Sequence, residues 1–162
     1  MQFITCFFGA LYVVIWIESN PVTKSESPSK INIDTVSIFG FISDNSSQLA
    51  FLESQVSGKD ILITETAFQE AQHIINSLAG SVEKANAQAF FRRSTLVPDN
   101  PSTRSKKLRP TGNLGANDIV ILGTGDELCI KTITADAKAV RAAAQGVLFD
   151  VVLHPPISLT GR

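Results

Sequence analysis

Short apolar segments rich in β-branched residues alternate with amphipathic segments along most of this chain. Residues 31–36 alternate apolar and polar side chains, and residues 60–63, 129–134 and 148–153 are apolar runs of strand length. Apolar residues between these runs recur with the period of a helix. Because consecutive parallel strands need crossover connections, usually helical, the alternation predicts an α/β fold with a parallel sheet covered on both faces.

The predicted helices have recognisable ends. The clearest covers residues 66–79, where an apolar stripe with the 3.6-residue period is followed by Gly80. Thr66 and Gln69 have the spacing of a capping box at its start. Further helices are expected over residues 47–56, 82–92, 117–122 and 137–145. Residues 94–115 contain no such pattern and are predicted to form a long loop of the functional or mobile kind.

The first 30 residues differ from the rest of the chain. Residues 1–17 hold about 15 apolar side chains, fewer than the roughly 20 that span a bilayer, and residues 18–30 have the composition of a linker. No basic segment and no clean cleavage site mark a signal peptide. We therefore divide the chain into an N-terminal segment, 1–30, and one compact domain, 31–162. The first segment has three open interpretations: a signal or membrane anchor, a misassigned start or fragment boundary, and a core element.

The composition excludes several classes of protein. Two cysteines, Cys6 and Cys129, form no disulfide framework and no zinc site with the usual spacing. We expect Cys129 to lie in a strand of the core. The net charge of −1 provides no global field that would attract a polyanion, so any argument for a nucleic-acid partner depends on local charge.

Four acidic residues lie where a parallel α/β fold places its functional sites. Asp34 lies in the C-terminal part of the first predicted strand, and Asp136 follows a later one. Ligands of such folds bind outside the carboxyl ends of the strands. Asp118 opens a predicted helix, and Glu70 lies beside the apolar stripe of the clearest helix.

Each acid also has a structural interpretation. Asp34 fits a turn at a strand end, and Glu70 fits an ion pair with a lysine. Asp118 fits a favourable charge at a helix N-terminus, and Asp136 fits a helix cap. Together, however, four carboxylates form the oxygen-only ligand set that Mg²⁺ or Mn²⁺ requires. Such ions polarise phosphodiesters and generate a hydroxide nucleophile.

Five short motifs follow one another along residues 31–153. They are Ile33-Asp34-Thr35, Glu70 within residues 64–71, Asn117-Asp118-Ile119 with Gly123-Thr124-Gly125 after it, Ile133-Thr134-Ala135-Asp136, and Ala143-Ala144-Gln145-Gly146. In this order and spacing they resemble the PIN-domain ribonucleases. The pattern departs from the family at Val36, where a small polar residue is common, and in the long segment before Asp118.

The resemblance implies a three-layer α/β/α sandwich with a mainly parallel sheet and metal-dependent endoribonuclease activity. Its catalytic and metal-binding residues would be Asp34, Glu70, Asp118 and Asp136, holding one or two Mg²⁺ or Mn²⁺ ions. Thr35, Thr134 and Asn117 would support them, with Thr134 steadying the loop of Asp136.

Basic residues are concentrated in one part of the chain. Residues 92–109 contain six basic side chains and one acid, a net charge of +5. A basic loop beside an acidic metal site would hold phosphates close to the ions; the alternative is a solvated, flexible loop. The candidate RNA-binding residues are Arg92, Arg93, Arg104, Lys106, Lys107 and Arg109.

Two further features of the sequence are weaker evidence for a functional site. Gly123-Thr124-Gly125 lacks the lysine and the spacing of a P-loop. His154, followed by two prolines, is expected to end the last strand and not to ligate a metal.

These observations favour a PIN-like ribonuclease that acts as a toxin, either paired with an antitoxin or as a polymorphic-toxin module with an immunity protein. A free-standing RNA-processing enzyme is a further open interpretation. The resemblance also leaves a homodimer open, which no feature of the sequence decides. The site of action is expected to be the cytoplasm, while residues 1–30 leave secretion or membrane anchoring open. The alternative is a non-catalytic PIN-like module that binds RNA or protein.

Overall fold

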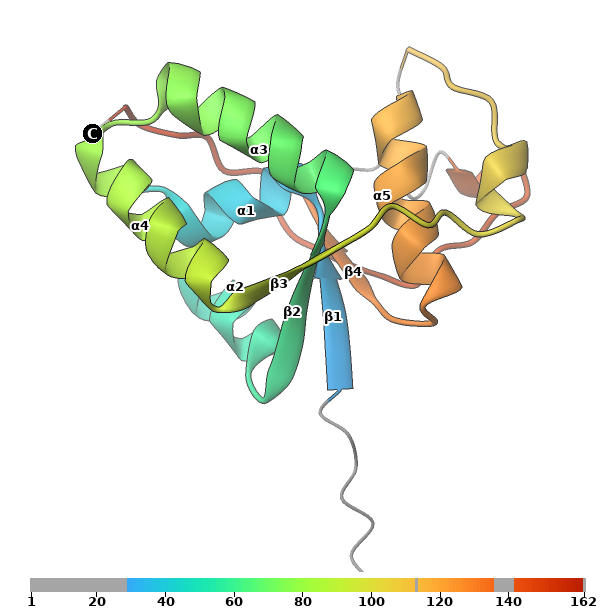
Figure 1. Cartoon of the computed structure of the whole chain (residues 1–162), viewed down its shortest axis with the longest axis horizontal. Coiled ribbons are helices and arrows are strands. Elements are labelled where there is room, and N and C mark those ends of the chain that lie inside the picture. Colours follow the sequence, from blue (N-terminus) through green and yellow to red (C-terminus); the bar gives the residue numbers. More distant parts are fainter. Residues whose placement is uncertain (1–28, 113, 136–141, 162) are drawn as a thin grey trace, which may run out of the picture.

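A five-stranded parallel sheet forms the centre of the protein (Figure 1). The computed structural model describes residues 29–112, 114–135 and 142–161. Every neighbouring pair of strands is parallel, and the spatial order is β3-β2-β1-β4-β5. The strands are β1 (Ser29–Ile33), β2 (Lys59–Thr64), β3 (Ser94–Val97), β4 (Thr132–Thr134) and β5 (Val151–Leu153). The predicted α/β fold with a parallel sheet is confirmed.

Helices lie on both sides of the sheet. Figure 1 shows α1, α2 and α4 on one side and α5 with the short helix η1 on the other, while α3 runs between the two groups. Their bounds are α1 (Thr35–Ile42), α2 (Leu49–Val56), α3 (Glu65–Leu78), α4 (Ser81–Arg92), η1 (Ser105–Lys107) and α5 (Ala116–Glu127). The helices predicted at 47–56, 66–79, 82–92 and 117–122 are therefore confirmed.

Two hydrophobic clusters stabilise these layers. The larger joins β1 and β2 to α1–α4 and includes Ile33, Ile38 and Ile63. The smaller lies beside α5 and includes Leu108 and Leu114. These two leucines belong to the segment predicted to be a long loop, so their burial holds that segment against the domain.

The first predicted strand is shorter than expected. β1 ends at Ile33, and Asp34 is the N-cap of α1, a helix that the sequence pattern did not predict. Thr35 and Val36 are β-branched and locally favour a strand. The cap and the burial of Ile38, Phe39 and Ile42 against the sheet outweigh that preference.

The N-terminal cap of α3 differs from the predicted capping box. Thr64 is the N-cap, and its hydroxyl accepts the N–H of Ala67 at 3.2 Å. Thr66 instead bonds to Asp99, which follows β3. The predicted capping box of Thr66 and Gln69 is therefore wrong.

The segment 94–115 is not a simple loop. It contains β3 and η1, and backbone bonds attach it to α5: Ser102 N–H donates to the carbonyl of Gly123 at 3.0 Å. The expectation for Cys129 is also wrong, because β4 begins only at Thr132 and Cys129 is exposed. Residues 1–28 and 136–141, and with them most of the helix predicted at 137–145, lie outside the described residues. None of the helices in the described ranges has both the length and the apolar character needed to cross a membrane.

Candidate active site

Asp34 stands at the carboxyl end of the central strand. Its side chain is 3 % exposed, and both of its oxygens accept hydrogen bonds. Oδ1 accepts the N–H of Thr35 at 2.7 Å, and Oδ2 accepts the hydroxyl of the buried Thr134 at 2.7 Å. Two rigid, neutral donors from neighbouring strand ends therefore fix the orientation of a buried carboxylate.

Thr35 connects Asp34 to Glu70. While its N–H donates to Asp34, its hydroxyl donates to Oε2 of Glu70 at 2.8 Å. The other oxygen of Glu70 accepts the side-chain amide of Asn117 at 2.6 Å. Glu70 forms no ion pair within the described part of the chain, so the suggested lysine partner is not found there. Residues predicted from three separate motifs thus converge on one edge of the sheet.

Asp118 lies on the first turn of α5, next to Asn117. Its Oδ2 accepts the N–H of Gly115 at 2.7 Å, which makes Asp118 the third residue of a capping arrangement. The suggested role of Asp118 at a helix N-terminus is therefore realised. The start of α5 lies beside Glu70, because Asn117, the neighbour of Asp118, donates to that carboxylate.

Thr134 supports Asp34 directly, because its hydroxyl donates to that carboxylate. The expectation that Thr134 steadies the loop of Asp136 stays a prediction. Asp136 itself lies outside the described residues. Asp34 therefore has a side-chain donor in Thr134, although Val36 stands where a small polar residue is common in the family that the sequence resembles. Ser37, one residue further on, donates instead to the carbonyl of Ile133 at 3.0 Å.

The donors at this edge suit a hard divalent cation. Asp34 and Glu70 offer carboxylate oxygens that are oriented by N–H and O–H groups, and such oxygens are the ligands that a hard divalent cation takes. Among residues 29–112, 114–135 and 142–161, no group of three His, Cys, Asp or Glu side chains lies close enough together to hold a metal.

Asp99 is a residue at this edge that the sequence reasoning missed. Its carboxylate accepts the N–H and the hydroxyl of Thr66, at 3.1 and 2.6 Å, and so caps the first turn of α3, the helix that carries Glu70. The available signal was an Asp two residues after the short apolar run Leu96-Val97. The strand that contains this run, β3, has only four residues and was not recognised.

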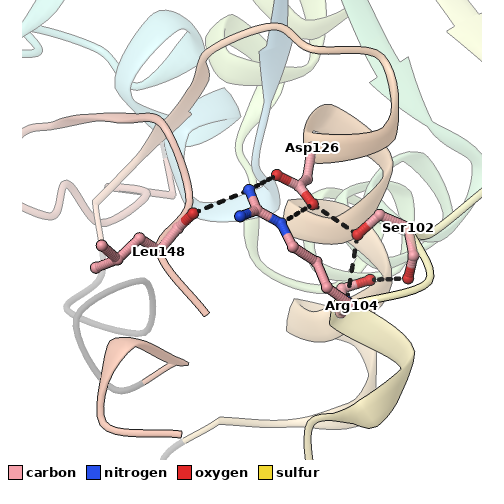
Figure 2. A network of polar contacts seen from close by, with 5 residues as sticks. Ser102, Arg104, Asp126 and Leu148 are labelled. Carbon is pink, nitrogen blue, oxygen red and sulfur yellow. Dashed lines mark hydrogen bonds and ion pairs between the residues drawn. The ribbon is translucent and has the colours of Figure 1, made fainter. Parts of the chain in front are cut away.

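Two of the six candidate RNA-binding cations form ion pairs with carboxylates. Arg93 donates to both carboxylate oxygens of Glu53 and lies over the ring of Phe90. Arg104 forms a two-pronged ion pair with Asp126 and also donates to the carbonyl of Leu148 at 3.1 Å (Figure 2).

The pair of Arg104 and Asp126 holds η1 against the end of α5. Figure 2 shows Ser102 joining the same carboxylate, with its hydroxyl 2.6 Å from Oδ2. The Arg104 guanidinium holds the pKa of Asp126 below its usual value. The remaining candidates, Arg92, Lys106, Lys107 and Arg109, are exposed and form no ion pair within the part of the chain that the structure describes.

Gly123-Thr124-Gly125 has a packing role inside α5. A Cβ at Gly123 would lie 2.2 Å from Oγ of Ser105, and one at Gly125 would lie 2.2 Å from Oγ1 of Thr132. The two glycines let η1 and the sheet approach the helix closely.

His154 follows β5, as predicted, and is 6 % exposed. Its Nε2 lies 2.9 Å from the hydroxyl of Ser37. Burial lowers the pKa of its imidazole below the usual 6.5, so the ring is neutral at neutral pH.

A comparison with known protein families assigns most of the chain to one family. The model of a family described as "Protein of unknown function (DUF1308)" matches residues 44–162, which include Glu70, Asp118 and Asp136. The chain belongs to the DUF1308 family. This DUF1308 match begins ten residues after Asp34.

This chain shares its fold with solved structures. It is similar to VapBC2 from Rickettsia felis, solved bound to a DNA fragment from their promoter, with 14 % identity, a TM-score of 0.52, and coverage of 77 % of this chain and 97 % of that one. It is also similar to DNA-bound VapBC from Salmonella typhimurium, with 13 % identity, a TM-score of 0.51, and coverage of 78 % and 98 %. These likenesses confirm the PIN-like α/β fold.

Proposed function

We propose that this protein is a Mg²⁺- or Mn²⁺-dependent endoribonuclease that acts as a toxin. The observation that carries the proposal is the hydrogen-bonded chain from Asp34 through Thr35 and Glu70 to Asn117. This chain lies at the carboxyl end of a parallel sheet, where α/β folds bind their ligands. The fold shared with VapBC proteins supports the same reading.

Asp34 and Glu70, which Thr35 connects, would hold the ion together with Asp136. Asp118, the fourth expected ligand, lies on the first turn of α5 and forms no group of three with Asp34 and Glu70 among the described residues. A bound Mg²⁺ or Mn²⁺ supplies Lewis-acid polarisation of the phosphodiester and an activated water. Thr35 and Thr134 keep both oxygens of Asp34 in one orientation, and Thr35 and Asn117 do the same for Glu70. Such fixed carboxylates need little reorganisation when charge develops on the scissile phosphate.

The exposed cations would bind the RNA backbone. Lys106, Lys107 and Arg109 lie on and just after η1, on the α5 side of the molecule, and Arg92 ends α4 on the other side. Because none of the four forms an ion pair within the described ranges, their charges are available to phosphates. Arg93 and Arg104 would contribute less, since carboxylates already pair with them.

A toxin of this kind would need a protecting protein. By analogy with the VapBC proteins of the same fold, we propose an antitoxin or an immunity protein as its partner. A second copy of the chain is a further proposed partner. Its substrate RNA would be met in the cytoplasm.

Cleavage of a mixed RNA pool by the full chain tests the proposal. We expect cleavage with Mn²⁺, none with EDTA, and a loss of at least about 100-fold in Asp34→Asn, Glu70→Gln and Asp136→Asn, because each removes a ligand charge at the ion. Asp60→Asn is the matched control, since Asp60 is exposed on β2 near the opposite edge of the sheet.

The outcomes separate the two functional classes. Full activity in the three site variants would refute the assignment of the site. Binding of RNA without cleavage under any metal would instead favour the non-catalytic PIN-like module.

A further inference from the structure

A hollow of about 500 Å³ opens between α3 and α4, away from the carboxylates. It is lined by Phe68, Gln72, Gln88, Phe91 and Arg92, and we call it the aromatic hollow. The rings of Phe68 and Phe91 meet edge to face, with centroids 5.0 Å apart and planes at 76°. Both rings are half-buried and pack against the larger core cluster, so they form a fixed apolar wall.

The polar side chains around the two rings form few contacts within the described part of the chain. Gln72 and Gln88 are exposed, and their side-chain amides have no hydrogen-bond partner among the residues that the structure describes. Arg92 donates Nε to the carbonyl of Gln88 in its own helix, at 3.2 Å, and pairs with no carboxylate in those ranges. The hollow therefore combines two aromatic rings, two amides that both donate and accept, and one cation without a carboxylate partner among the described residues.

This combination fits one class of occupant better than others. A nucleobase stacks on aromatic rings and presents both donors and acceptors at its edge, and its phosphate is attracted to an arginine. A hollow of about 500 Å³ has room for a single base. A stable protein partner would instead need an apolar surface of about 800 Å² on each side.

The position of the aromatic hollow relates it to the candidate active site. Phe68 precedes Glu70 by two residues on α3, so the two side chains leave the same turn on different sides of a helix about 10 Å across. A nucleic-acid strand that crosses the N-terminal part of α3 can therefore reach both the aromatic hollow and Glu70.

We propose that the aromatic hollow binds one base of a single-stranded RNA whose scissile phosphodiester lies at the edge formed by Asp34 and Glu70. The inference rests on the proposed nuclease function and adds to it a subsite and a preference for unpaired RNA. Duplex RNA does not fit, because its bases are stacked on one another and cannot enter the hollow.

Binding in the absence of metal tests the subsite separately from catalysis. The full chain is titrated into a short fluorescein-labelled oligouridylate in EDTA, as wild type and as Phe91→Leu, which keeps apolar volume but removes the ring. We expect Phe91→Leu to bind about 5- to 150-fold more weakly, from the 1–3 kcal/mol that stacking of one base contributes. Phe51→Leu is the matched control, because Phe51 is 40 % exposed on α2 and does not line the hollow.

A second variant removes the cation without touching the packing. Arg92→Ala should weaken binding and lower its salt dependence, since Arg92 is exposed. Thermal unfolding of each variant checks that the fold is intact.

The outcomes distinguish this subsite from the nuclease proposal. Equal affinity of Phe91→Leu and wild type, or absence of any wild-type binding, overturns the subsite whatever the cleavage assay shows. A wild-type dimer that Phe91→Leu converts to a monomer assigns the hollow to a second copy of the chain and overturns it too. Binding that depends on Phe91 in a protein that cleaves no RNA supports the subsite and refutes the nuclease.

Discussion

At the scale of single residues, close packing around α5 explains a motif whose sequence resembles a phosphate loop. Gly125 lies in the helix where β1 and β4 approach it, and its Cα faces Thr132 and the buried Asn32. Asn32 in turn donates to the carbonyl of Ile121 at 3.0 Å and to Thr132 at 3.1 Å. The glycine thus allows a buried polar contact between helix and sheet that a larger residue would obstruct.

Gly125→Ala should destabilise the protein by about 1 kcal/mol. The added Cβ would stand 2.2 Å from Oγ1 of Thr132, a rigid β-branched side chain, and such overpacking costs about 1–3 kcal/mol. Helix propensity alone favours alanine by about 1 kcal/mol, so the sign of the change decides between packing and propensity. Urea unfolding measures it, with Gly112→Ala as the control because nothing lies within 4 Å of its Cβ position. A more stable Gly125→Ala would contradict this packing.

At the scale of elements, the chain after β5 is fastened to the turn between α3 and α4. Figure 1 shows this C-terminal end beside that turn, far from β5. Glu83 is buried there, and its carboxylate accepts the N–H groups of Thr160 and Gly161 at 2.6 and 3.0 Å. It also accepts the N–H of Gly80 at 3.2 Å. Burial raises the pKa of Glu83, but these hydrogen bonds outweigh burial and leave the pKa below its usual value.

Glu83→Gln should destabilise the protein by about 1–3 kcal/mol at pH 7, because the amide cannot accept all of these bonds. The pKa of Glu83 is lower in the folded chain than the usual 4.5, so its contribution is complete above about pH 5. The stability that the charged carboxylate contributes is lost as the pH falls through the pKa of the folded chain. The difference in free energy of unfolding between variant and wild type should therefore narrow over that pH range. Denaturant unfolding from pH 7 to pH 3 measures this gap. An unchanged gap would show that Glu83 is not charged in the folded chain; Glu127→Gln, at an exposed site, is the control.

Some helices and strands could be predicted from the sequence, and others could not. The amphipathic stripe of α3 and the alternation of strands and helices are local patterns, so the sequence was sufficient for them. α1 was missed because seven of its eight residues are buried, which removes the helical alternation of polar and apolar side chains. Cys129 was misplaced because it occupies the position after α5 with a φ of 54°, where glycine is usual.

At the scale of the whole molecule, the charge is divided between separate surfaces. Carboxylates gather at the carboxyl edge of the sheet, and exposed cations lie to either side of it. The grouping of Asp34, Glu70 and Asn117 was predictable, because strand ends and helix starts of a parallel sheet meet at one edge. The ion pairs of Arg93 and Arg104 could not be predicted, because their partners, Glu53 and Asp126, lie 40 and 22 residues away in the sequence.

The central claim is that the carboxylate edge binds a divalent ion, and thermal unfolding of the full chain with and without Mn²⁺ tests it most directly. An ion that binds only the folded state raises the melting temperature by mass action, by about 5–10 °C at a hundred times the dissociation constant. We expect this rise in wild type and in Asp60→Asn, and its loss in Asp34→Asn. An equal rise in Asp34→Asn, or no rise in wild type, would contradict the account.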